Sequence, residues 1–189
     1  MTNPTQQHDG RQSTQNAAGS VHSIATTYTL SVQIVQSMAI THRVPARKVQ
    51  AIARLVKKLS LTEDEADTVV AICADHNAQP NKIAKLMGKG YEPQQVLSLY
   101  EVRDSLGGGW SDDTPSLDQI ALLDQTFSME ADTNSLTDLI SEIEKGCSFV
   151  SLSSAVRIVC STAKQYGFIT AEATLDRIAI HRGEAVGYE

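Results

Sequence analysis

The segment RVPARKVQAIARLVKKLS, residues 43–60, carries six Lys and Arg side chains and no acidic one. Cations at this density can bind nucleic-acid phosphates, because each contact releases counterions from the polyanion. The apolar residues of the segment recur at helical spacing, so the segment predicts an amphipathic helix with one basic side. A packing helix whose basic side is merely hydrated has the same pattern. The candidate nucleic-acid-binding residues are Arg43, Arg47, Lys48, Arg54, Lys57 and Lys58.

A second group of cations lies in NKIAKLMGKGYEPQQVLSLYEVR, residues 81–103. A short apolar helix, a glycine turn and a second helix predict a helix-turn-helix, with its reading helix beginning near Gln94. Carboxylates in that second helix would repel phosphates, so an ordinary helical hairpin is the competing interpretation. The cations of this second patch are Lys82, Lys85 and Lys89.

Catalytic and metal-binding patterns are weak. Cys73 and His76 have the spacing of half a metal site, but a zinc site needs two more ligands, and Cys147 and Cys160 have no nearby His. The glycine-rich stretches GGGW and MGKGY lack the spacing that cradles phosphates. No nucleophile can be paired with a base. We therefore expect no enzymatic activity, no metal and no cofactor.

Local signals predict helices along most of the chain. Proline at helix starts, glycine at helix ends and apolar residues at helical spacing define the expected segments. Residues 26–41 alternate like a strand and also form a helical stripe, so the choice there stays open, with helix favoured. The other expected helices lie within 43–60, 62–77, 80–87, 93–106, 116–127, 134–146, 151–167 and 170–183.

Two parts of the chain resemble each other. Residues 49–69 and 156–178 each contain an apolar helix, a short turn and a threonine that opens a second helix. One inserted residue aligns Thr62 with Thr170. A duplicated helical hairpin would explain this similarity, and so would shared capping chemistry. Two copies are too few to indicate a repeat protein.

Composition supports an all-α protein. Of the 189 residues, 41% are hydrophobic and 5% are aromatic, so the core must be largely aliphatic. We expect a compact bundle of about seven to nine short helices behind a disordered polar tail, residues 1–22. Residues 23–189 are predicted to form a single domain, with a candidate sub-boundary at the Gly-rich linker 107–116.

Charge is divided into blocks along the chain. No acidic residue lies between Asp9 and Glu63, whereas residues 90–145 contain twelve acids against Arg103 and Lys145. Such blocks can pair within the molecule, between copies, or with a charged partner. No apolar run is long enough to cross a bilayer, the N-terminus lacks a signal-peptide pattern, and the three cysteines are widely spaced. We expect a cytoplasmic protein without membrane contact.

These observations predict a non-catalytic binding protein. The first hypothesis is a small nucleic-acid-binding or regulatory protein that uses the basic helix. The alternative is a protein–protein interaction adaptor, chaperone or assembly subunit that pairs basic and acidic surfaces. In that alternative, the same blocks would also support a homo-oligomer.

Overall fold

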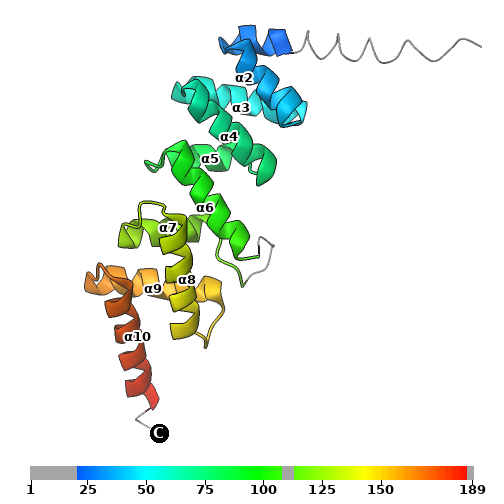
Figure 1. Ribbon diagram of the computed structural model, residues 1–189. Coiled ribbons are helices and arrows are strands. Elements are labelled where there is room, and N and C mark those ends of the chain that lie inside the picture. Colours follow the sequence, from blue (N-terminus) through cyan, green and yellow to red (C-terminus); the bar gives the residue numbers. More distant parts are fainter. Residues whose placement is uncertain (1–20, 108–112, 187–189) are drawn as a thin grey trace, which may run out of the picture. The chain divides into compact units, whose positions relative to one another are not determined.

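The computed structural model describes residues 21–107 and 113–186. These two ranges contain helices, turns and loops and no β-strand, which confirms the all-α prediction (Figure 1). They hold ten helices, slightly more than the seven to nine expected. None of the helices described is long and apolar enough to span a membrane. Most of the predicted tail lies outside the described residues, but its last two residues already belong to a helix over 21–28.

The ambiguous segment 26–41 is helical with one break. The helix over 21–28 ends at Thr29, whose φ of 56° lies in the left-handed region. Helix α2 (Val32–Gln36) then begins after Ser31, whose side chain accepts a hydrogen bond from the Ile34 N–H. It continues into a π-helical turn, η1 (Ser37–Thr41). The alternation that resembled a strand spans this break, which is why neither period dominated the sequence.

Contacts divide the chain between Lys89 and Gly90 into two compact units. In unit 1, α3 packs against α4, α5 and η1, while α4 also packs against α2 and η1. The predicted single domain, with its sub-boundary at 107–116, stays a prediction, and residues 108–112 lie outside the described ranges. The remaining helices of unit 1 are α3 (Ala46–Leu59), α4 (Glu63–Asp75) and α5 (Pro80–Met87).

Unit 2 contains five helices that pack in a regular order. Helix α6 packs against α8, α7 against α9, and α8 against α10, so each contacts the helix two positions further along the chain. Figure 1 shows α7 and α9 running alongside each other. Packing of this kind is typical of stacked helical hairpins. The helices are α6 (Pro93–Ser105), α7 (Leu117–Phe127), α8 (Thr133–Gly146), α9 (Leu152–Tyr166) and α10 (Ala171–Val186).

Three of the hairpin turns share one backbone arrangement. The residue after α3, α7 and α9 is left-handed, with φ of 54° at Ser60, 54° at Ser128 and 70° at Gly167. The next N–H then bonds to a carbonyl five residues earlier, which satisfies an otherwise free helix-end acceptor. These bonds run from Leu61 to Val56 (3.1 Å), from Met129 to Asp124 (3.1 Å) and from Phe168 to Ala163 (2.9 Å).

A buried polar pair joins the start of unit 2 to α7. The Tyr91 hydroxyl lies 2.7 Å from Oδ2 of Asp124, and the Ala131 N–H donates to the same carboxylate at 2.6 Å. Burial raises the pKa of Tyr91, so its hydroxyl remains a donor. Around this pair the core is largely aliphatic, as expected from the composition. The pair therefore fixes the turn between α7 and α8 as well as the entry to α6.

Candidate functional site

Helix α3 is amphipathic, as predicted. Val49, Ile52 and Val56 are buried on one side. The helix begins at Ala46, directly after Pro45. Arg43 is exposed in the turn before it. The basic side of the helix therefore faces solvent, while binding of nucleic acid by that side stays a prediction.

Two of the predicted binding cations are engaged inside unit 1. Lys48 Nζ donates to Oδ1 of Asn77 at 2.7 Å, and Arg54 Nε donates to the Tyr28 hydroxyl at 3.0 Å. These bonds connect α3 to the segment after α4 and to the helix over 21–28. The side chain of Arg47 lies outside the described residues. Lys48 and Arg54 thus have structural partners that the sequence pattern did not indicate.

The other cations of unit 1 divide into two groups. Lys57, Lys58 and Lys82 are exposed and have no hydrogen bond or ion pair with any residue that the structure describes. Lys85 and Lys89 each interact with a neighbouring group. Three exposed lysines therefore remain available for a polyanion.

The two units differ strongly in charge. Residues 1–89 carry ten Lys and Arg against six Asp and Glu, a net charge of +4. Residues 90–189 carry six against sixteen, a net charge of −10. The predicted helix-turn-helix is split by this boundary, because its lysines lie on α5 of unit 1 and Gln94 lies on α6 of unit 2. That DNA-reading arrangement stays a prediction.

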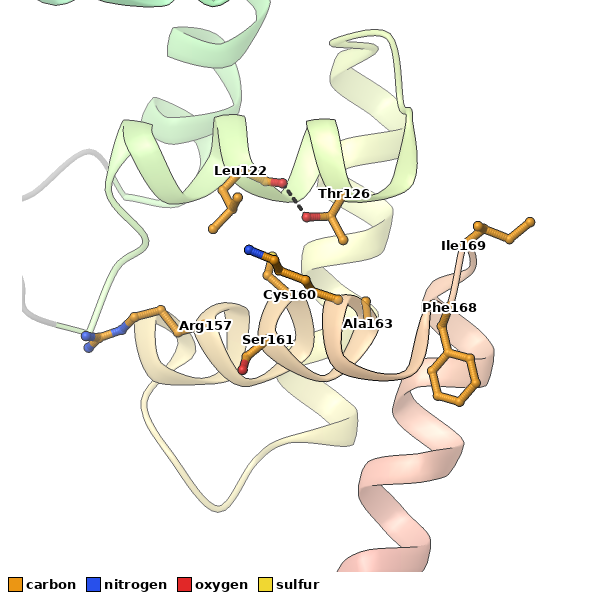
Figure 2. A pocket seen from close by; sticks show the side chains of 10 residues that line it. Leu122, Thr126, Arg157, Cys160, Ser161, Ala163, Phe168 and Ile169 are labelled. Carbon is orange, nitrogen blue, oxygen red and sulfur yellow. Dashed lines mark hydrogen bonds between the residues drawn. The ribbon is translucent and has the colours of Figure 1, made fainter.

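An open cavity of about 690 Å³ lies in unit 2, between α7, α9 and the turn that follows α9 (Figure 2). Figure 2 shows Leu122 and Thr126 projecting from α7 toward α9. Leu122 is 45% exposed and Ile169 is 83% exposed, so the cavity is a groove with apolar, accessible walls. We call it the α7–α9 groove and define it by Leu122, Thr126, Cys160, Ala163, Phe168 and Ile169.

The turn after α9 builds one end of this groove. Gly167 has a φ of 70°, which an L side chain would strain, and it reverses the chain so that Phe168 returns over α9. The Phe168 ring stacks on Tyr166 with centroids 5.7 Å apart. Arg177 of α10 lies 4.8 Å from the centroid of the Tyr166 ring. Helix α10 therefore supports the aromatic end of the groove.

The exposed Ile169 corresponds to the inserted residue of the internal similarity. In the α3–α4 turn, Leu61 is followed directly by Thr62. In the α9–α10 turn, Ile169 stands between Phe168 and the matching threonine. The hydroxyl oxygens of both threonines accept a backbone N–H three residues later, so the shared capping is confirmed, whereas a duplication stays a prediction. This inserted residue was the signal that could have indicated the groove from the sequence.

Two cations flank the groove on α9. Arg157 and Lys164 are seven residues apart, which is two helical turns, or about 10.5 Å along the axis. Both side chains are exposed, and neither has an ion pair or hydrogen bond among the described residues. Figure 2 shows Arg157 at the end opposite Phe168. The groove therefore combines apolar walls with local positive charge in a strongly acidic unit.

The groove offers no reactive group. Burial raises the pKa of the Cys160 thiol, which disfavours the nucleophilic thiolate. Thr126 Oγ1 donates to the Leu122 carbonyl at 2.7 Å and so is already satisfied. Burial likewise raises the pKa of Cys73 to about 12 and that of Cys147 above its usual value. No cluster of three or more metal-ligating side chains occurs in the described ranges.

Comparison with known proteins gives no relative for this chain. No protein-family model, no curated protein and no solved structure matches it. The functional argument therefore rests on the geometry and charge of the chain itself.

Proposed function

We propose that the protein is a non-catalytic protein-interaction module that binds an apolar segment of a partner in the α7–α9 groove. One observation carries the proposal: Leu122 and Ile169 expose 45% and 83% of their surface beside a concave surface. Clustered apolar groups on such a surface gain free energy when a partner removes them from water. A cytoplasmic location belongs to the same proposal and is supported by three free, buried thiols.

The open shape favours a macromolecular segment over a small ligand. Small-molecule sites usually enclose about 70–90% of the ligand surface and present a few unsatisfied polar groups. Here Ile169 protrudes into solvent, and the Thr126 hydroxyl is bonded within its own helix. A helix or extended peptide needs contact on one side only, which this groove can provide.

Selection of peptides without prior assumptions tests the proposal. The full chain would be panned against a random peptide display library, and enriched peptides would be titrated by fluorescence anisotropy. The titrations would compare wild type with Leu122→Asp and with Ile180→Asp. Ile180 is a matched control, because it is a 51% exposed aliphatic residue on α10 outside the groove.

We expect enriched peptides to carry clustered apolar residues and to lose more than tenfold in affinity with Leu122→Asp. A charge placed on the apolar wall would have to be desolvated by the peptide, which explains the loss. Ile180→Asp should change the affinity less than twofold. Equal losses with both variants, or no enrichment over an unrelated helical protein, would contradict the proposal.

A second candidate function is polyanion binding by unit 1. It is favoured by the net charge of +4 and by the exposed Lys57, Lys58 and Lys82, which are free of partners among the described residues. Duplex DNA and RNA would be titrated at several salt concentrations against wild type and against a variant with these three lysines changed to Gln. Each lost phosphate contact should reduce the salt slope by about 0.9. Absence of binding at low salt would exclude this function.

A further inference from the structure

We infer that the segment bound in the α7–α9 groove is an acidic amphipathic helix. Its apolar side would lie on Leu122 and the Phe168–Ile169 turn, and two of its carboxylates would pair with Arg157 and Lys164. The inference rests on the proposed function, since it names the chemistry of the partner for the same groove. It adds a charge preference that an apolar groove alone would not produce.

Most cations of unit 2 already have partners within the unit. Arg103 forms an ion pair with Asp104 at 2.8 Å. Arg177 lies over the Tyr166 ring, and Arg182 lies 3.8 Å from the centroid of the Phe149 ring. These contacts assign the other arginines of the unit to internal structure.

Arg157 and Lys164 differ from those arginines in two ways. Both line the groove, and both lack a partner among the described residues. Sixteen acidic residues in the same unit would readily supply intramolecular partners, yet these two cations remain open beside the groove. Their placement is complementary to an anionic ligand that also presents apolar groups.

The spacing of the cations matches a helical ligand. Residues seven apart lie on the same side of a helix, and Ser161 lies between Arg157 and Lys164 on that side. A ligand helix aligned with α9 would meet both cations if its own carboxylates were also seven residues apart. Apolar residues at the intervening three- and four-residue spacings would then face Leu122 and Phe168.

Local and long-range charge make opposite predictions, which sharpens the test. The net charge of −10 in residues 90–189 repels any acidic peptide at long range, whereas the two groove cations attract it at contact. At about 0.15 M salt the screening length is near 8 Å, so distant acids are screened more than contacting pairs. A preference for acidic peptide at this salt concentration would therefore report the groove cations.

The probe is a labelled synthetic amphipathic helix with Leu at the third, fourth and next-turn positions between two Glu residues placed seven apart. A matched peptide carries Gln at both Glu positions, and another carries Lys. Each is titrated against wild type, Arg157→Gln/Lys164→Gln, and Lys57→Gln/Lys58→Gln. The last variant removes the same charge from exposed lysines of α3, so it controls for net charge.

We expect wild type to bind the Glu peptide about tenfold more tightly than the Gln peptide, as two exposed ion pairs allow. The Lys peptide should bind most weakly. The preference for Glu should disappear in Arg157→Gln/Lys164→Gln and remain in Lys57→Gln/Lys58→Gln. Loss of the preference in both variants would assign it to net charge and overturn the inference.

Failure of the inference and failure of the proposed function give different results. Equal binding of the Glu and Gln peptides, with both lost in Leu122→Asp, would overturn the acidic partner and leave the groove as an apolar peptide site. No binding of either designed peptide would overturn the inference, and panning would then decide whether the groove binds peptides at all. Displacement of the Glu peptide by a fatty acid that binds more tightly would assign the groove to lipids instead. Self-association abolished by Arg157→Gln/Lys164→Gln would assign it to a second copy of the chain.

Discussion

The α3–α4 and α9–α10 hairpins, one in each unit, use the same turn for different ends. Ser60 and Gly167 are both left-handed, and the following N–H bonds to the same carbonyl position in each helix. In the first turn the helix-capping threonine comes next, whereas in the second Ile169 is inserted before it. A single added residue in a conserved backbone arrangement thus places an exposed aliphatic side chain beside a groove.

The two hairpins also differ in how the second helix is capped. At α4 the Thr62 N–H donates to the Glu65 carboxylate at 2.7 Å, which completes a reciprocal capping box. At α10 the residue in the equivalent position is Ala173, so Thr170 caps alone. The comparison suggests that the first hairpin is built for local stability, while the second carries the candidate binding surface.

The largest expected effect comes from removing the inserted residue. Deletion of Ile169 would convert the α9–α10 turn to the length of the α3–α4 turn and remove the most exposed apolar side chain of the groove. We expect affinity for groove-selected peptides to fall more than tenfold, or about 1.4 kcal/mol. Anisotropy titration measures the loss. Ile169→Ser keeps the length, so a smaller loss in that variant would show that turn length matters beyond the side chain.

An exchange of the left-handed residues should break the similarity of the two turns. Gly167→Ser should destabilise the protein by about 1 kcal/mol, because a side chain disfavours the left-handed conformation. Ser60→Gly should stabilise it by a similar or smaller amount, for the converse reason. Chemical denaturation of each variant gives both values. Destabilisation by Ser60→Gly would show that the Ser60 side chain contributes more than its backbone strain costs.

A smaller effect is expected from completing the missing capping box. Ala173→Glu would give α10 the threonine and glutamate pair that α4 already has. The new carboxylate should stabilise the helix start by about 0.5 kcal/mol. Denaturation at neutral pH measures this gain, and Ala173→Gln separates the hydrogen bond from the charge. No gain in either variant would mean that the exposed start of α10 frays independently of global unfolding.

The smallest effect is a pH dependence at the existing capping box. Hydrogen bonds from the Thr62 backbone and hydroxyl lower the pKa of Glu65 below its usual 4.5. Because the folded pKa is the lower one, the stabilisation is present above pH 4.5 and is lost as pH falls through the folded value. Wild type should therefore exceed Glu65→Gln in stability at neutral pH, and the difference should vanish in acid. A difference that stays constant with pH would exclude the carboxylate as its source.

Helices were predictable from the sequence because their signals are local. Thr62 with Glu65, Pro80 and Pro93 each mark a helix start through interactions within one turn. The candidate site was not predictable in this way. Exposure of Leu122 depends on how α7 packs against α9, and the bond from Lys48 to Asn77 joins residues 29 apart. Local periodicity carries no information about either.

The three buried cysteines make each unit report its own opening. Cys73 belongs to unit 1, while Cys147 and Cys160 belong to unit 2, and all three are free and buried. A thiol reagent can modify them only when the surrounding helices separate, so each modification rate measures a local opening free energy under native conditions. Cys160 also lies in the α7–α9 groove, so an occupied groove would slow its modification while leaving that of Cys73 unchanged. The wild-type chain thus carries, without added labels, an internal reference beside a sensor of groove occupancy.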